Sequence, residues 1–208
     1  FYESAVEMGI ERMSAFLKKF NLGKETKIDL ASEKDGVVPN REWKKTNFKS
    51  KQNQNWYLGE TVIAGIGQGY MLATPLQLAY ATSIIANRGH AFKPHILKQI
   101  YSKDSDEILI NEAERIDHLI DIDQQYWDVV FDGMNAVVNE QRGTAFGVFP
   151  ENSDIAGKTG TSQVFSMDKR SGDDVPEELR DHGLFIGFAP INNPEIVIAV
   201  IVENGGGG

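Results

Sequence analysis

The chain has 208 residues and an ordinary globular composition, 41% hydrophobic and 25% charged, which excludes a fibrous or wholly disordered protein. Its net charge of -9 excludes a non-specific nucleic-acid binder, because binding phosphates needs a basic surface, and no nucleic-acid partner is expected. The lack of cysteine excludes disulfides, thiolate metal sites and a cysteine nucleophile.

Helices are predicted in the first two thirds of the chain. Apolar residues recur every three or four positions over residues 6–20, which predicts one continuous helix there. Residues 44–55 are rich in Lys, Asn and Gln and predict a solvated loop. A second helix is expected to begin at Thr74, which is a good N-cap and is followed by a proline. A third is expected to begin near Asp123.

The last quarter of the chain changes to an extended pattern. Strands are predicted over residues 155–165, 184–189 and 196–202, and the turn at 192–194 makes the last two a hairpin. Residues 196–202 lack polar alternation, which predicts that both faces of that strand are buried. Helices followed by an antiparallel sheet predict an α+β fold with helices packed on the sheet. No boundary is expected within residues 1–208.

The clearest chemical pattern is Lys158-Thr159-Gly160-Thr161, followed by Ser162, on the first predicted strand. Lys158 supplies a cation, and the hydroxyls of Thr159 and Thr161 lie on one face because they are two residues apart. Gly160 allows a substrate backbone to approach closely. With the backbone N–H of Thr161 as an oxyanion donor, the segment forms the carboxylate clamp that acyl transfer from a peptide C-terminus requires.

The triplet Lys-Thr-Gly belongs to the signature of penicillin-interacting serine enzymes, although alone it also fits an ordinary exposed strand end. Other segments extend the similarity along the chain: Gly65 to Tyr70, Ala73 to Ala79, Gly143-Thr144-Ala145, Arg180-Asp181-His182, Leu184 to Pro190 and Val202 to Gly206. Together they resemble penicillin-binding transpeptidases, and within these the class B, elongation-type branch known as penicillin-binding protein 2. Phe1-Tyr2 resembles the residues that follow the Ser-x-Asn or Ser-x-Asp motif of this family.

This resemblance implies roles for the matching residues. Lys158 would orient and support the serine of the second motif and the substrate. The hydroxyls of Thr159 and Thr161 would hold the terminal carboxylate of a D-Ala-D-Ala stem peptide or of a β-lactam, and Gly160 and Ser162 would complete the substrate-binding strand. The N–H of Thr161 would supply half of the oxyanion hole.

The resemblance also implies where the remaining parts lie. We expect residues 1–208 to be the C-terminal portion of the transpeptidase domain, truncated at both ends, with the serine nucleophile upstream of Phe1. The fragment by itself is therefore expected to be inactive. The parent would be anchored in the bacterial inner membrane with this domain in the periplasm, would need no cofactor, and would work with a membrane glycan polymerase of the elongation machinery.

Several other patterns are given structural interpretations. Ser166-Met167-Asp168-Lys169 matches Ser-x-x-Lys, but it follows Lys158 too closely for three groups to converge from separate elements, and a solvated loop is expected. Gly65, Gly67 and Gly69 are expected in tight turns. The four histidines lack metal-ligand spacing, so no metal site is expected; His182 is expected to make a structural hydrogen bond.

Two alternative functions remain open at this point. A D-Ala-D-Ala carboxypeptidase or β-lactamase-like hydrolase shares the strand motif and uses water as the acceptor; the similarity over residues 184–206 favours the transpeptidase. A catalytically dead penicillin-binding sensor domain would share the fold and lack the upstream serine or lysine.

Overall fold

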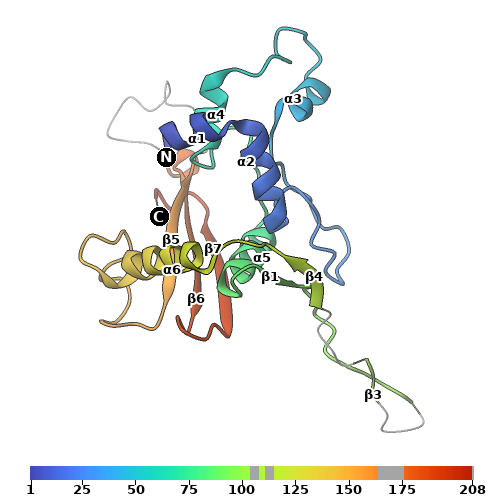
Figure 1. Ribbon diagram of the computed structural model, residues 1–208, viewed down its shortest axis with the longest axis vertical. Coiled ribbons are helices and arrows are strands. Elements are labelled where there is room, and N and C mark those ends of the chain that lie inside the picture. The colour runs from blue at the N-terminus through green and yellow to red at the C-terminus, as the bar shows by residue number, and fades with distance from the viewer. Residues whose placement is uncertain (104–107, 111–114, 164–175, 208) are drawn as a thin grey trace. The chain divides into compact units, whose positions relative to one another are not determined.

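A computed structural model gives the fold and describes residues 1–103, 108–110, 115–163 and 176–207 (Figure 1). The chain forms two compact units, Phe1–Asp121 and Ile122–Gly208. The periodicity of the sequence does not mark this division, and each unit is described by itself. Within the described ranges, no helix has both the length and the apolar character that crossing a bilayer requires.

The first unit is mainly helical. Its elements are α1 (Tyr2–Met8), α2 (Ile10–Leu17), the 3-10 turn η1 (Lys18–Phe20), α3 (Arg41–Asn47), α4 (Leu58–Ala64) and α5 (Pro75–Ala86). The single helix predicted over residues 6–20 is in fact broken at Gly9, whose φ of 76° lies in the left-handed region that side chains disfavour. The expected tight turns are present, with positive φ at Gly67 and Gly69.

Helix α5 begins where the sequence predicts. The Thr74 hydroxyl accepts a hydrogen bond from the Gln77 backbone N–H at 3.1 Å, and the Gln77 side-chain oxygen accepts one from the Thr74 N–H at 3.0 Å. This reciprocal capping box satisfies two donors that the first helical turn leaves without partners. The side-chain nitrogen of Gln77 then donates to the backbone carbonyls of Lys24 and Asp35, at 2.7 and 2.8 Å. One buried glutamine thus caps the helix and holds the segment between η1 and α3.

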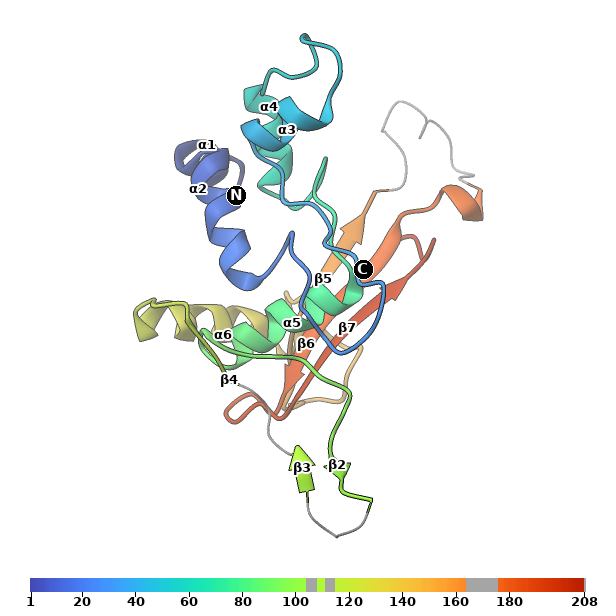
Figure 2. The same cartoon turned by 90° about the vertical axis from the view of Figure 1, so that its right-hand side faces the viewer.

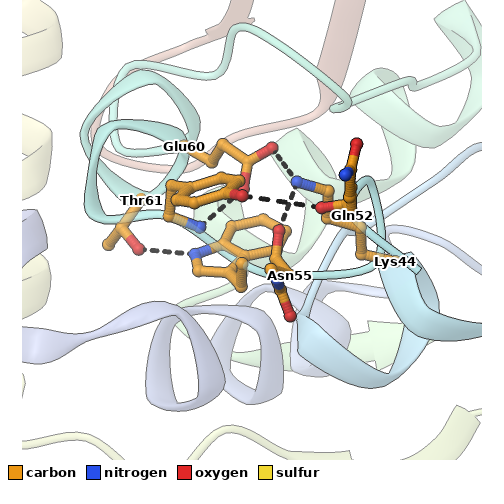
Figure 3. A network of polar contacts seen from close by, with 7 residues as sticks. Lys44, Gln52, Asn55, Glu60 and Thr61 are labelled. Carbon is orange, nitrogen blue, oxygen red and sulfur yellow. Dashed lines mark hydrogen bonds and ion pairs between the residues drawn. The ribbon is translucent and has the colours of Figure 1, made fainter. Parts of the chain in front are cut away.

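The prediction of a solvated loop over residues 44–55 is wrong at its start. Residues 44–47 belong to α3, and only 3% of the Lys44 side chain is exposed. Its ammonium group binds the carboxylate of Glu60 and donates to the backbone carbonyl of Asn55 at 2.6 Å (Figure 3). The rings of Phe48, Trp56, Tyr57 and Tyr70 lie 5.1–5.9 Å from this ammonium. The prediction from polar composition failed here because a charged side chain can be buried when it is fully paired.

Four short strands complete the described part of the first unit, and the sequence pattern does not predict them. Strand β1 (His90–Phe92) pairs antiparallel with β4 (Arg115–Leu119), and β2 (Ile100–Tyr101) pairs antiparallel with β3 (Ile108–Ile110). They have only two to five residues each, which is too few for an alternating pattern to be recognised.

The second unit is a helix on an antiparallel sheet. Its elements are α6 (Gln124–Asn139), β5 (Ala156–Ser162), the 3-10 turn η3 (Glu177–Leu179), β6 (His182–Ala189) and β7 (Ile196–Val202). The strands lie in the order β5-β6-β7, and α6 packs beside β5 (Figures 1 and 2). Helix α6 begins near Asp123, as predicted, and the Asp123 carboxylate caps it by accepting a hydrogen bond from the Gln125 N–H at 3.1 Å. These elements confirm the α+β class and the terminal hairpin.

The core of this unit lies between α6 and one face of the sheet. The rings of Phe131 and Phe188 are 4.8 Å apart, and Phe188 and Ala156 are 2% and 0% exposed. The opposite face of β7 carries exposed residues, namely Ile196, Ile198, Val200 and Val202, at 42–65%. The prediction that both faces of this strand are buried is therefore wrong for the described chain. An apolar run shows that a strand can be buried, but its neighbours decide which faces are covered.

Candidate active site

The residues of the predicted clamp lie on β5, which forms an edge of the three-stranded sheet among the described strands. Thr159 is paired with Phe185 and Thr161 with Gly183, while Lys158 is paired with Ile186. Successive side chains of a strand point to opposite faces, so Thr159 and Thr161 share one face and Lys158 lies on the other. The structure confirms the spacing argument for the two threonines.

Lys158 is exposed at this edge. Its ammonium group donates to the backbone carbonyl of Thr159 at 2.7 Å, so the side chain folds back along its own strand. A lysine stem is flexible and carries three donors, so this bond leaves donors for a ligand or for a hydroxyl on a neighbouring element. The cation is therefore held close to the segment that carries both threonines.

Two glycines of β5 are explained by packing. A Cβ atom on Gly157 would overlap the ring of Phe185. A Cβ atom on Gly160 would lie 3.3 Å from the Cβ atom of Leu184, which is a tight contact. Gly160 was expected to leave room for a substrate backbone. The tight approach of a Cβ atom at this position to Leu184 shows that close packing of β5 on β6 also favours glycine here.

A residue that the sequence analysis left without a role contacts the clamp directly. The hydroxyl oxygens of Thr144 and Thr159 are 2.7 Å apart and form a hydrogen bond in which either can be the donor. Thr144 lies in the loop that follows α6, fifteen residues before its partner. Sequence reasoning used Gly143-Thr144-Ala145 only as part of a resemblance, and only the tertiary structure shows the contact.

The local sequence explains how Thr144 is placed. A side chain on Gly143 would overlap the carbonyl oxygens of Ala136 and Val137, so only glycine lets the chain turn this tightly against the end of α6. The Ala145 N–H then donates to the carbonyl of Val137 at 3.0 Å, and the Ala145 side chain is 2% exposed. Thr144 lies between Gly143 and Ala145, and its hydroxyl group points to β5.

A cavity of about 570 Å³ opens beside this pair of threonines. Thr144 and Thr159 provide hydroxyl groups, and the other side chains of its wall are apolar. They come from the loop after α6 and from β6 and β7: Ala145, Val148, Phe149, Leu184, Phe185, Ile198, Val200 and Val202. Gly205 and Gly207, from the turn after β7, also line it.

The turn after β7 is held against the same region by His182. The Nδ1 atom of His182 accepts a hydrogen bond from the Asn204 backbone N–H at 2.9 Å, which requires that this nitrogen carry no proton. The Gly206 N–H donates to the Asp181 carbonyl at 2.9 Å. A Cβ atom on Gly207 would lie 3.9 Å from the Thr161 hydroxyl oxygen, so the turn reaches the clamp. The structural hydrogen bond predicted for His182 is confirmed.

Two further predictions concern the Ser-x-x-Lys segment and metal binding. The segment Ser166-Met167-Asp168-Lys169 falls outside the described residues. In the part of the chain that the structure describes, no three His, Cys, Asp or Glu side chains come together in a group that could hold a metal ion.

The model for the penicillin-binding protein transpeptidase domain family matches residues 1–208, the whole chain. The chain belongs to this family. Among curated proteins, it is 41% identical over 212 residues to the peptidoglycan D,D-transpeptidase MrdA of Escherichia coli K12, a match that covers 100% of this chain and 32% of that protein. The MrdA protein of Acinetobacter baumannii is 42% identical over 208 residues, with 99% and 30% covered.

Solved structures support the same assignment for this transpeptidase domain. Penicillin-binding protein 2 of Pseudomonas aeruginosa, in complex with WCK 5153, matches with a TM-score of 0.76 and 43% identity over 98% of this chain and 41% of that chain. Penicillin-binding protein 2 of Helicobacter pylori, in complex with MreC, matches with a TM-score of 0.76 and 32% identity over 100% and 34%. The chain therefore spans about a third of the length of the curated relatives that it matches.

Proposed function

We propose that the protein carrying this chain is a peptidoglycan D,D-transpeptidase of the penicillin-binding protein 2 type. The observation that carries the proposal is the geometry of β5, whose register sets the Thr159 and Thr161 hydroxyls on one face. Lys158 lies on the other face, and its ammonium group reaches the Thr159 backbone carbonyl of the same strand. The names of the relatives support it, since those of Escherichia coli and Acinetobacter baumannii are D,D-transpeptidases.

In the proposed reaction, the terminal carboxylate of a D-Ala-D-Ala stem peptide binds the hydroxyls of Thr159 and Thr161. A serine upstream of Phe1 loses its proton to a base and attacks the penultimate D-Ala carbonyl carbon. The Thr161 N–H donates to the oxyanion that forms. The C–N bond then breaks, D-Ala leaves with a proton on its amine, and an amine of a neighbouring stem peptide attacks the acyl-enzyme and releases the serine.

Lys158 supports this chemistry through its charge. Its ammonium group lies where it can stabilise the substrate carboxylate and donate to a hydroxyl of the second motif, which would come from upstream. A β-lactam carries a carboxylate next to its reactive carbonyl group, so it would use the same clamp and acylate the same serine. Gly160 and Ser162 complete the strand along which the ligand lies.

The cellular setting is part of the proposal. We infer that the protein is anchored in the inner membrane with this domain in the periplasm, where stem peptides are found, and that it works with a membrane glycan polymerase. One relative, 30% identical with a TM-score of 0.69, supports the polymerase partner, since it belongs to a peptidoglycan synthase complex that coordinates polymerization and crosslinking. The relative from Helicobacter pylori was solved with a different partner, MreC.

The test is the intact mass of the full-length protein after incubation with benzylpenicillin, followed by peptide mapping. We expect a stable one-to-one adduct on a serine upstream of Phe1. Lys158→Ala should slow acylation on the order of a hundredfold, because a charged group beside the reacting centre is lost. Ser153→Ala is the control, since the hydroxyl of this half-buried serine donates to the Pro150 carbonyl and Ser153 does not lie on β5 or in the wall of the cavity.

The outcomes separate the alternative functions. An adduct that decays with turnover of the drug would indicate a β-lactamase-like hydrolase. Release of D-Ala from a stem peptide with water as the only acceptor would indicate a carboxypeptidase. A folded protein that forms no adduct and turns over no drug would indicate a catalytically dead domain, and would overturn the proposal.

A further inference from the structure

We propose that Thr144 is a positioning residue for substrate recognition. It donates its hydroxyl proton to the Thr159 oxygen and thereby directs the single Thr159 proton toward the ligand carboxylate. The inference rests on the proposed function, because it assigns a helper to one arm of the carboxylate clamp. The observation that carries it is the 2.7 Å contact between the two hydroxyl oxygens.

The direction of this hydrogen bond follows from counting protons. A threonine hydroxyl has one proton to donate and two lone pairs that accept. Without ligand, either threonine can be the donor, and the Thr159 proton can be used on Thr144. A carboxylate can only accept, so once it is bound Thr159 must donate to it. The Thr159 oxygen can then accept a hydrogen bond, and the Thr144 hydroxyl donates its proton to it.

The resulting chain runs from the Thr144 hydroxyl to the Thr159 hydroxyl and on to the carboxylate. Hydrogen bonds arranged in this order polarise one another, so the Thr159 hydroxyl becomes a better donor. Thr144 also restricts the rotation of the Thr159 side chain, which lowers the entropy lost when the ligand binds.

The fold around Thr144 supports a positioning role. The residue is fixed by its neighbours, because Gly143 lies against the last carbonyls of α6 and Ala145 is buried and bonded to Val137. Its side chain is itself exposed and lines the same cavity as Thr159. An exposed threonine adds little to the core, so the rigid placement of its hydroxyl is the feature that requires an explanation.

The experiment uses the full-length protein and the second-order rate of acylation by benzylpenicillin. The variants are Thr144→Val, Thr144→Ser, Thr159→Val and the double variant, with Ser153→Ala as the control. Thr144→Val keeps the shape and removes the hydroxyl, and we expect it to lower the rate about threefold to tenfold, the effect of one neutral hydrogen bond. Thr144→Ser should restore the rate to about the wild-type value, because the hydroxyl is retained.

The double variant separates positioning from a general structural effect. If Thr144 acts through Thr159, adding Thr144→Val to Thr159→Val should lower the rate no further. Thermal unfolding of each variant checks that the fold is kept, and Thr144→Ala replaces Thr144→Val if the latter unfolds early.

Three results would overturn the inference: an unchanged rate for Thr144→Val, a Thr144→Ser variant as slow as Thr144→Val, or losses that simply multiply in the double variant. A wild-type protein that is not acylated at all would instead overturn the proposed function, and this inference with it. The wild-type rate therefore distinguishes the two failures.

Discussion

The ammonium group of Lys44 lies against the carboxylate of Glu60 (Figure 3). Four aromatic rings, those of Phe48, Trp56, Tyr57 and Tyr70, lie 5.1–5.9 Å from this ammonium group. The Lys44 and Glu60 side chains are 3% and 19% exposed. Burial acts to raise the pKa of Glu60, but the bonds from Lys44 and from the Tyr57 N–H outweigh it, so this pKa lies below its ordinary value. A segment with the composition of a solvated loop thus contains a buried ion pair.

Lys44→Met should destabilise the first unit by about 3 kcal/mol, because breaking a buried pair leaves its other charge without compensation. Lys45→Met is the matched control, since Lys45 is exposed on the same helix, and it should change stability by less than about 0.5 kcal/mol. Urea unfolding followed by tryptophan fluorescence measures both, because Trp56 lies beside the Lys44 ammonium group and Trp43 packs on Tyr70, which also lies beside it. Equal losses in the two variants would contradict the role of this pair.

The same pair predicts a pH dependence. The pKa of Glu60 is depressed in the folded state, so its contribution is fully present above the unfolded-state pKa and is lost as the pH falls through the folded-state pKa. Acid titration of the melting temperature should show this loss in the wild type. In Lys44→Met the pKa of Glu60 should rise, because the bond from the ammonium group is gone. The loss of melting temperature on acidification should then be smaller. A parallel acid profile in both proteins would argue against the assignment.

Gln77→Glu should release the segment that precedes α3 from helix α5. The Gln77 side-chain nitrogen donates to two backbone carbonyls, and Gln77 is 1% exposed. A carboxylate in its place would face the carbonyls of Lys24 and Asp35 with no proton to donate, at an expected cost of about 2–4 kcal/mol. Hydrogen exchange over residues 21–38 should increase. Gln125→Glu, on the exposed first turn of α6, is the control and should leave exchange there unchanged.

The contact between the Asp29 carboxylate and the backbone of Ile96 and Leu97 should be sensitive to acid. The carboxylate accepts the backbone N–H groups of Ile96 and Leu97 at 2.7 and 2.8 Å, and these bonds hold its pKa below the ordinary value. The two bonds should be stable above the unfolded-state pKa and lost as the pH falls through the folded-state pKa. Hydrogen exchange of a peptide covering residues 96–97, corrected for the intrinsic effect of pH, should show this loss. Asp29→Asn should abolish the pH dependence, whereas Asp121→Asn should preserve it.

Gly143→Ala should slow acylation, whereas Gly133→Ala should not. A Cβ atom at Gly143 would overlap the carbonyls at the end of α6, so the loop that carries Thr144 must move, and acylation by benzylpenicillin should slow about tenfold or more. Gly133 lies within α6 with open space around it, so alanine there should stabilise the helix by about 1 kcal/mol and leave acylation unchanged. A Gly143→Ala protein acylated at the wild-type rate would show that the position of Thr144 has no effect on the clamp.

Much of the second unit could be predicted from local sequence. The cap at Asp123 marks the start of α6, and apolar runs on either side of a turn mark the hairpin of β6 and β7. The separation of two residues places Thr159 and Thr161 on one face wherever the strand lies in the fold. These features depend on residues that are close in the chain, so helical and strand periodicity are sufficient to find them.

The contacts that the sequence did not reveal join residues farther apart. Thr144 and Thr159 are 15 positions apart, and Lys44 and Glu60 are 16 apart. The sequence by itself determined the α+β class, the cap of α5 at Thr74, the start of α6 near Asp123 and the position of Thr159 and Thr161 on one face of a strand. Only the tertiary structure decided which hydroxyl contacts Thr159, which lysine is buried and which face of β7 is covered. The physical reason is that burial and hydrogen-bond partners depend on neighbours brought together by folding, and local periodicity does not specify them.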